Sequence, residues 1–334
     1  MMDLKDKTTI SWASIGCGNV CEVKSLPAMY KLPGSQVVGI YSRSFSKATD
    51  FASRHKIKTV YASVNELLLD PQIDIVYIST PPDTHHSYTL AALNAGKHVY
   101  VEKPMALNFQ DALEMHRLAE KQNRIVFVAH YRRGLAYFQQ VKSLLSKEAI
   151  GKLLGIQMEL IQAPSEADQI SPLPWRLRSA ISGGGYFYDL APHALDIVAF
   201  VLADSFKEVS GFACNRVSLY EAEDSISAAF MTDNGIPGTA FWSFVASEKA
   251  RVDRIRIVGT EGSIAFSVFN FEPIVLTQMG KDEAFTFENP AHIQEPFIHN
   301  ILQHLREKEP ALCTSKEAIN VAWAMDRIMR KAGV

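Results

Sequence analysis

The first 130 residues alternate short runs of β-branched residues with longer helical patterns, and this alternation constrains the fold more than any other feature of the sequence. Such alternation is typical of βαβ units, in which crossover helices join parallel strands. We expect six strands, at residues 9–15, 36–42, 59–61, 75–79, 98–101 and 125–129. Six parallel strands with crossover helices predict a doubly wound sheet that binds its ligand at the carboxyl ends of the strands.

After about residue 150 the pattern changes to alternating strands at regular spacing. In Arg254–Val258 the arginines alternate with isoleucines, which predicts a sheet with one exposed and one buried face. We expect an antiparallel sheet across residues 152–290, followed by helices at 293–307 and 315–331. The predicted fold class is α/β: an N-terminal doubly wound parallel sheet and a C-terminal α+β domain with a large, mostly antiparallel open sheet.

Composition excludes several classes of protein. Lys and Arg number 34 against 36 Asp and Glu, and no basic block is present, which argues against a nucleic-acid partner. The four cysteines have neither the paired spacing of a zinc site nor the density of a disulfide scaffold, which favours the reducing cytoplasm and no metal. No run approaches the roughly 18 apolar residues of a membrane span, and the polar start MMDLKDKTT is unlike a signal peptide. We therefore expect a cytoplasmic protein with no membrane partner.

A glycine-containing turn, Gly16–Cys21, follows the first predicted strand directly and opens a helical stretch. Gly16 permits a tight turn, and Gly18 lets the backbone approach a pyrophosphate whose charge the helix amino end stabilises. Cys21 stands where the fingerprint has Gly or Ala, so we expect the helix to pack slightly further from the strand. An ordinary strand-to-helix turn is the alternative, but the position at the first βα junction favours dinucleotide binding.

The end of the second strand indicates which dinucleotide is preferred. An NAD site commonly carries an acidic residue there, whereas this chain has Ser42 and Arg43. A hydroxyl and a guanidinium can bind the 2′-phosphate that a carboxylate would repel. We therefore predict NADP(H) as the preferred cofactor, with NAD(H) possible; the alternative is that Arg43 is a solvated loop residue.

The fifth strand ends in Glu102-Lys103-Pro104, at the sheet edge where ligands bind. Pro104 disfavours helical geometry at Lys103, which keeps the backbone extended and fixes where the ammonium points. A solvated Glu-Lys pair is the alternative, and the position at a cofactor-facing strand end favours a functional role.

A second candidate lies in Gly183–His193, where a glycine run precedes Asp189 and His193. On one helix, residues four apart share a face. Pro192 is tolerated best in a first turn, which favours a helix start near Asp189. Histidine suits proton transfer from a hydroxyl near neutral pH, and a carboxylate can orient it. The alternative is a capping Asp189 and a core His193.

Four phrases together resemble the glucose-fructose oxidoreductase, inositol 2-dehydrogenase and rhizopine-catabolism family, commonly called Gfo/Idh/MocA. They are SIGCGNV, STPPDTHHSYTLAALNAGKHVYVEKP, GGGYFYDLAPHALD and IRIVGTEGSI, and the resemblance extends over essentially the whole chain. It implies a Rossmann domain, placed at 1–130, and a domain for substrate binding and oligomerisation, placed at 131–334. It also implies that NAD(P) and a sugar or polyol meet between the two domains.

The resemblance also implies roles for individual residues. Lys103 is similar to the family lysine, and Asp189 and His193 are similar to its substrate-side pair. The loop after the fourth strand and a Trp-Arg pair fall where the family contacts the cofactor. Together, the sequence and the resemblance predict catalytic Lys103, Asp189 and His193, and cofactor-binding Gly16, Gly18, Asn19, Val20, Ser42, Arg43, Thr80, Pro81, His85, Glu102, Lys103, Trp175 and Arg176.

The resulting hypothesis is reversible hydride transfer between nicotinamide and a carbinol or carbonyl carbon of a sugar, polyol or related cyclic alcohol. His193 would move the hydroxyl proton, Lys103 would stabilise the alkoxide and Asp189 would position the substrate or the imidazole. The alternatives are a glycoside hydrolase that oxidises its substrate transiently with NAD, and a non-catalytic sugar or dinucleotide sensor. We expect a homodimer or homotetramer formed through the C-terminal sheet.

Overall fold

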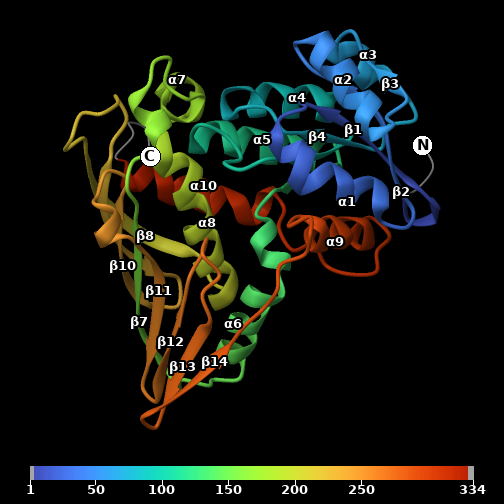
Figure 1. The fold of residues 1–334 in the computed structure, drawn as a ribbon. Helices are drawn as coiled ribbons and strands as arrows, with labels where there is room; N and C mark the ends of the chain where they lie inside the picture. The colour runs from blue at the N-terminus through green and yellow to red at the C-terminus, as the bar shows by residue number, and fades with distance from the viewer. Residues whose placement is uncertain (1–3, 330–334) are drawn as a thin grey trace. The chain divides into compact units, whose positions relative to one another are not determined.

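The computed structural model describes residues 4–329, and they form two compact units. The first unit comprises the described residues of Met1–Leu135 together with Asn289–Ile319. The second comprises Ala136–Glu288 together with the described residues of Asn320–Val334. The first unit is therefore built from two separate segments of the chain (Figure 1).

The first unit is built on a six-stranded parallel sheet, which confirms the predicted doubly wound architecture. The strand order is β3-β2-β1-β4-β5-β6, and every pair is parallel. The observed bounds lie within about two residues of the predicted ones. They are β1 (Ile10–Ile15), β2 (Ser35–Tyr41), β3 (Thr59–Val60), β4 (Ile75–Ile78), β5 (His98–Val101) and β6 (Val126–Val128).

The crossover helices explain why the central strands are buried throughout. Every residue of β1 and β4 is buried, because a doubly wound sheet is covered on both faces. The α-helices between strands are α1 (Leu26–Lys31), α2 (Phe45–His55), α3 (Val64–Leu69), α4 (His85–Asn94) and α5 (Phe109–Lys121). Ser63 and Asn108 accept hydrogen bonds from the backbone at the starts of α3 and α5, so side-chain caps set these helix starts.

A single π-helical turn, η2 (Cys21–Ser25), precedes α1. The helix that follows the glycine turn begins at Asn19 and continues through η2 into α1. Pro27 lies in the first turn of α1 and has no N–H, so it cannot donate to the carbonyls of the preceding turn. A widened turn at this position follows from the proline, and π turns of this kind occur frequently at functional sites.

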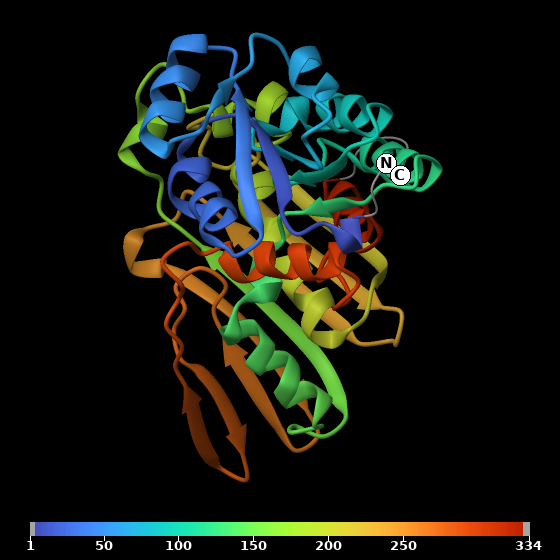
Figure 2. The ribbon, with the colours of Figure 1, turned by 90° about the vertical axis from the view of Figure 1, so that its right-hand side faces the viewer.

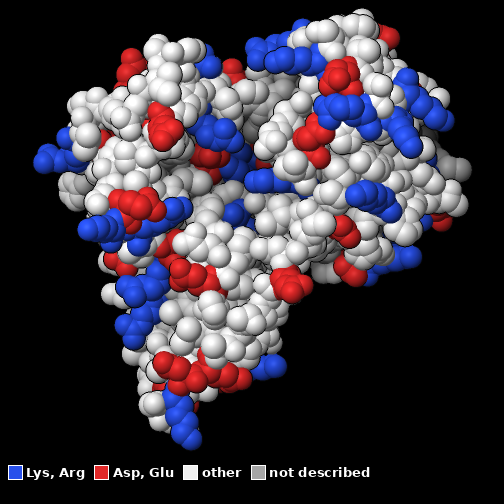
Figure 3. Space-filling view, viewed as in Figure 1, with Lys and Arg blue, Asp and Glu red and all other residues white. Residues whose placement is uncertain are grey.

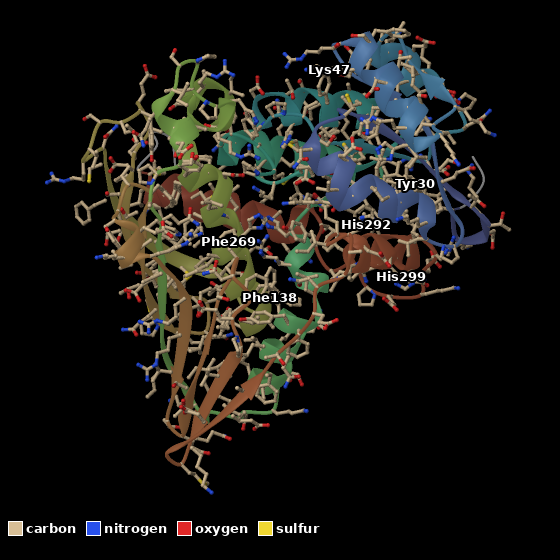
Figure 4. The ribbon with its side chains drawn as sticks, viewed as in Figure 1. Tyr30, Lys47, Phe138, Phe269, His292 and His299 are labelled. Carbon is tan, nitrogen blue, oxygen red and sulfur yellow. The ribbon has the colours of Figure 1, made fainter. Side chains whose placement is uncertain are left out.

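Residues 289–319 pack with the first unit, although the sequence placed them in the second domain. The ring of Phe297, in α9 (Glu295–Leu305), stacks on Tyr100 of β5 with the centroids 5.9 Å apart. Arg306 donates to the carbonyl oxygen of Gly34 at 2.8 Å. Helix α9 lies beside α1, and Figure 4 labels Tyr30 of α1 together with His292 and His299 of the returning segment.

The second unit contains an eight-stranded sheet in the order β14-β13-β12-β11-β7-β10-β9-β8. Every neighbouring pair is antiparallel except β10 and β7, which are parallel, so the predicted antiparallel sheet is correct except at this pair. The strands are β7 (Leu153–Ile161), β8 (Phe206–Cys214), β9 (Ser225–Thr232), β10 (Pro237–Ser243), β11 (Val252–Gly259), β12 (Gly262–Phe266), β13 (Ile274–Gln278) and β14 (Lys281–Phe285).

Helices cover one face of this sheet. Figures 1 and 2 show α6 (Ala136–Ser146) and α8 (Gly185–Leu202) on the same side of the strands. Phe187 of α8 meets the Trp242 ring at right angles with centroids 5.2 Å apart, and Phe138 of α6 meets Phe266. The last described helix, α10 (Ser315–Ile328), starts where the sequence predicted; the end of the predicted helix 315–331 lies outside the described residues.

The other face of the sheet carries exposed side chains. Phe212 is 71% exposed and Phe241 is 40% exposed, while Glu159 and Arg254 form an ion pair at 2.9 Å across neighbouring strands. Figure 3 shows acidic and basic side chains at the turn between β13 and β14, where Lys281 and Asp282 are exposed. Residues 4–329 include no helix with both the length and the apolar character needed to cross a bilayer.

Candidate active site

The turn after β1 has the geometry that the glycine pattern predicts. Gly16 has φ +114°, and a β-carbon there would lie 2.6 Å from Ser79 Oγ, so only glycine fits. The amide of Gly16 donates to the Tyr41 carbonyl at 2.8 Å, which joins the turn to the end of β2. Asn19 and Val20 form the first helical residues after this turn.

Gly18 provides a test of whether a dinucleotide fits this turn. A β-carbon built at Gly18 would have no described atom within 4 Å, so the protein itself does not require glycine there. The space in front of Gly18 is open, and the helix amino end beside it favours an anion. The turn therefore fits the pyrophosphate of a dinucleotide.

Cys21 is fully buried between the helix and the sheet. Its thiol lies 2.8 Å from Ser79 Oγ and 3.5 Å from the Gly16 carbonyl. Burial raises the pKa of Cys21 to about 12, so the side chain remains a neutral thiol. Cys21 thus packs the helix against the sheet and holds Gly16 and Ser79 together.

Ser42 and Arg43 follow β2 directly, at the same edge of the sheet as the glycine turn. Arg43 is exposed, and Ser42 Oγ accepts a hydrogen bond from Ser44 N at 3.4 Å. Ser44 in turn caps α2. A hydroxyl, a guanidinium and a helix start therefore lie next to one another where an NAD site commonly has a carboxylate.

The loops after β4 and β5 are joined by His85. This side chain is fully buried, and its two ring nitrogens lie 2.9 Å from the Thr80 carbonyl and 2.8 Å from the Pro104 carbonyl. Burial lowers the pKa of His85. Because both ring nitrogens face backbone oxygens, His85 acts by holding the two loops, which carry Pro81 and Lys103 at the carboxyl edge of the sheet.

Glu102 directly follows the last residue of β5 and is only 7% exposed. Its Oε1 accepts hydrogen bonds from Tyr77 Oη at 2.7 Å and from Gln294 Nε2 at 2.8 Å. Lys103 follows it and is half-buried. The sequence did not single out Tyr77 or Gln294, because no local pattern connects Glu102 with residues 25 and 192 positions away.

In the second unit, the glycine run forms the start of α8. Gly183, Gly184 and Gly185 all have positive φ, and Ser182 Oγ accepts hydrogen bonds from the last two amides at 3.3 and 3.0 Å. The helix therefore begins at Gly185, and Pro192 lies inside it. The expectation of a helix start near Asp189 is wrong, because Ser182 and the glycines already start the helix four residues earlier.

Asp189 and His193 both lie on α8, one turn apart. Asp189 Oδ2 accepts a hydrogen bond from Arg176 Nε at 2.8 Å. The Arg176 guanidinium also lies 4.5 Å from the centre of the Trp175 ring in η6 (Trp175–Leu177). Three of the predicted site residues are thus in direct contact, and Asp189 does not cap the helix.

His193 is 5% exposed, and its ring meets Phe269 edge-on with centroids 5.7 Å apart. A second contact holds the loop before α8: Tyr186 Oη donates to buried Asp168 Oδ1 at 2.6 Å. Burial and Asp168 raise the pKa of Tyr186 to about 12. The loop is therefore attached to the first turns of α8 at two points, Tyr186 and Asp189.

Two family models match this chain. Residues 10–130 match the oxidoreductase family with an NAD-binding Rossmann fold, and residues 138–265 match the GFO/IDH/MocA C-terminal domain. Within residues 4–329, no group of three or more His, Cys, Asp or Glu side chains is arranged to hold a metal ion.

Known proteins of similar sequence extend over nearly the whole chain. Oxidoreductase P35 of Formosa agariphila is 35% identical over 323 residues, which cover 96% of this chain and 98% of that protein. The 1,5-anhydro-D-fructose reductase of Ensifer adhaerens is 28% identical over 289 residues, 85% of this chain and 84% of that protein. A levoglucosan dehydrogenase solved with NADH and levoglucosan shares the fold, with a TM-score of 0.84, 23% identity and 97% coverage of both chains.

Proposed function

The chain belongs to the Gfo/Idh/MocA oxidoreductases, and from this premise we propose that it transfers a hydride between a nicotinamide dinucleotide and a carbinol or carbonyl carbon of a sugar or polyol. The observation that carries the proposal is the open space at Gly18 beside a helix amino end, at the carboxyl edge of a doubly wound sheet. Bound NAD(P) supplies the hydride-transfer chemistry.

Most of the residues proposed to hold the dinucleotide follow β1, β2, β4 and β5, which are neighbours in the first sheet. The turn with Gly16, Gly18, Asn19 and Val20 would bind the pyrophosphate through backbone N–H groups. Thr80, Pro81 and Glu102 would line the adjoining edge, and His85 would keep their loops in place through its contacts with two carbonyl groups. Trp175 and Arg176 remain proposed contacts of the nicotinamide end.

We propose NADP(H) as the preferred cofactor and NAD(H) as a weaker alternative. Support comes from Ser42 and Arg43, which can bind a 2′-phosphate through a hydroxyl and a guanidinium. No carboxylate stands at these two positions to repel that phosphate.

The similarity to 1,5-anhydro-D-fructose reductase supports a cyclic sugar or a related polyol as the substrate class. Proton handling would fall to His193, because an imidazole can accept a hydroxyl proton during oxidation and return it during reduction. Lys103 would stabilise negative charge on the substrate oxygen. Asp189 would hold the substrate with its position fixed by Arg176, since their side chains are in contact at 2.8 Å.

The assembly and the compartment are part of the same proposal. The outer face of the eight-stranded sheet exposes Phe212 and Phe241, and apolar side chains on an open sheet favour pairing with a second copy. We propose a homodimer or homotetramer formed through this face. The four cysteines lie at positions 17, 21, 214 and 313 without a disulfide among them, which supports a cytoplasmic location.

Fluorescence titration with NADPH and NADH tests the cofactor, and an absorbance screen of sugars and polyols with the tighter-binding dinucleotide tests the reaction. We expect NADPH to bind more tightly and at least one cyclic sugar or polyol to change the absorbance of the nicotinamide. Glycoside cleavage without a net absorbance change would identify the hydrolase alternative instead. Absence of binding by both dinucleotides would contradict the proposal.

A further inference from the structure

Gln294 is a buried polar residue immediately before α9, and both the nitrogen and the oxygen of its side-chain amide are hydrogen-bonded. Its Nε2 donates to Glu102 Oε1 at 2.8 Å, and its Oε1 accepts from Tyr100 Oη at 2.8 Å. The residue is 0% exposed. A buried amide with both ends satisfied fixes the orientation of the groups that it bonds. Gln294 is therefore one of two donors that hold Glu102 Oε1, together with Tyr77.

The two oxygens of Glu102 have different environments. Oε1 accepts from both Tyr77 Oη and Gln294 Nε2, whereas Oε2 accepts no hydrogen bond from any residue in the described range 4–329. Burial, and next the charge of Glu102, raises the pKa of Tyr77 and of Tyr100 well above the usual value, so both phenols remain donors. A carboxylate that is 93% buried thus presents one acceptor at the end of β5.

The segment that carries Gln294 is also attached to the helix that follows the glycine turn. His292 Nδ1 donates to the Val23 carbonyl at 3.1 Å, and the backbone N–H of Gln294 donates to the Lys24 carbonyl at 3.3 Å. In a regular α-helix the Val23 carbonyl would accept from residue 27, but Pro27 has no N–H. The returning segment therefore supplies the Val23 carbonyl with the donor that Pro27 lacks, and its bonds to Val23 and Lys24 connect that helix with the end of β5.

We propose that Gln294 is a positioning residue of the cofactor site, which holds Glu102 so that Oε2 accepts a hydrogen bond from a hydroxyl group of the bound dinucleotide. This inference rests on the proposed function. It assigns a role in cofactor binding to a residue that lies 192 positions from Glu102 in the sequence.

Three variants of the full chain test the role. Gln294→Met removes both hydrogen bonds, and Gln294→Glu keeps an acceptor for Tyr100 but replaces the donor to Glu102 by a second carboxylate. Asn300→Leu is the matched control: Asn300 is buried in α9 and bonds the Pro310 carbonyl and the Leu312 amide, with no contact to Glu102. The measurements are the NADPH dissociation constant by fluorescence and the thermal unfolding of the apoprotein.

All three variants should unfold at a lower temperature, because each leaves buried polar groups without partners. Only the two Gln294 variants should bind NADPH less tightly, by about tenfold, the loss expected for one hydrogen bond to a charged group. The KM for NADPH should rise by a similar factor while kcat changes less than about twofold. Tyr77→Phe removes the other donor to Glu102 Oε1 and should weaken NADPH binding by about threefold. This variant tests the positioning role if the Gln294 variants do not fold.

Unchanged affinity in the Gln294 variants, with tight binding by the wild type, would overturn the positioning role and leave the proposed function standing. The same conclusion would follow from unchanged affinity in Tyr77→Phe if only that variant folds. If the wild type binds neither NADPH nor NADH, the proposed function fails and the role of Gln294 fails with it.

Discussion

Arg176 Nε and Asp189 Oδ2 are 2.8 Å apart, so the carboxylate proposed to position the substrate is already oriented by a guanidinium from the preceding loop. The side chains are 39% and 20% exposed, which limits the contribution of the ion pair to stability to about 1 kcal/mol or less. The effect of this contact should therefore be larger on activity than on folding.

Replacing Arg176 with Ala should raise the KM for the sugar or polyol about tenfold, because Asp189 loses the hydrogen bond that orients it. The thermal midpoint should change little. Arg251→Ala, which breaks the exposed pair with Glu248, is a control of the same kind in the same unit. Equal kinetics in the two variants would show that the Arg176–Asp189 contact has no part in substrate binding.

The two glycines of the turn after β1 should respond in opposite ways to alanine. Gly18→Ala should leave the thermal midpoint unchanged, because the new methyl meets no described atom within 4 Å, yet it should weaken NADPH binding at least tenfold. Gly16→Ala should lower stability by about 1–3 kcal/mol, because its φ is +114° and Ser79 is too close. Calorimetry and fluorescence titration measure the two effects. A Gly18→Ala protein with wild-type affinity would mean that the pyrophosphate binds elsewhere.

Arg43→Ala should weaken NADPH binding about tenfold and leave NADH binding within about twofold, because only NADPH carries the 2′-phosphate. Lys58→Ala removes one exposed positive charge beyond the far end of α2 and serves as the control. Ser42→Asp should shift the preference toward NADH. Equal losses for both cofactors in Arg43→Ala would contradict the proposed phosphate contact.

Lys103→Met should lower kcat at least about a hundredfold, because a positioned charged group near the substrate oxygen contributes about that much. The NADPH dissociation constant should stay within about threefold. Lys121→Met, at an exposed position in α5, should change neither quantity. Full turnover by Lys103→Met would remove Lys103 from the mechanism.

His98 should make the protein less stable in mild acid. Burial lowers the pKa of His98 to about 4, while the unfolded chain has the ordinary value near 6.5. The unfolded state therefore binds a proton more readily than the folded state. The contribution of neutral His98 to the free energy of unfolding is complete above pH 6.5 and is lost as the pH falls toward 4. The full difference is on the order of 3 kcal/mol.

His98→Asn keeps an acceptor for the Ile125 amide, which bonds His98 Nδ1 at 3.2 Å, but it does not titrate. Urea denaturation of both proteins at pH 7.5 and pH 5 measures the effect. The wild type should lose more stability than the variant over this interval. Parallel losses in the two proteins would mean that His98 is not the group responsible.

Local pattern was sufficient to predict the parallel sheet and the places of many site residues. Continuous apolar runs mark strands that are buried on both faces, and the carboxyl end of each such strand is a candidate ligand edge. For this reason Gly16, Ser42 and Lys103 could be assigned to one edge from the pattern alone, whereas Thr80 was implied by the family resemblance.

Other features depend on contacts that no local pattern encodes. The Glu102–Gln294 bond joins two distant stretches of chain, and the parallel pairing of β10 with β7 interrupts an otherwise antiparallel sheet. Pro192 misled the prediction of the helix start, since the glycines and Ser182 provide a start that a rule for proline alone does not include. In the first two cases the deciding partner is supplied by tertiary structure, whereas the contacts of Ser182 with the glycines are local and a proline rule does not consider them.

Because residues 289–319 pack in the first unit, that unit cannot complete its folding until late in translation. Translation delivers the six parallel strands early, but Phe297 and Gln294, which cover Tyr100 and bond Glu102, emerge from the ribosome only after the whole eight-stranded sheet has been synthesised. Until then Tyr100 lacks its cover by Phe297, and the Glu102 carboxylate has Tyr77 but not Gln294 as a donor. A separately expressed nucleotide-binding fragment would need residues 289–319 spliced behind residue 135.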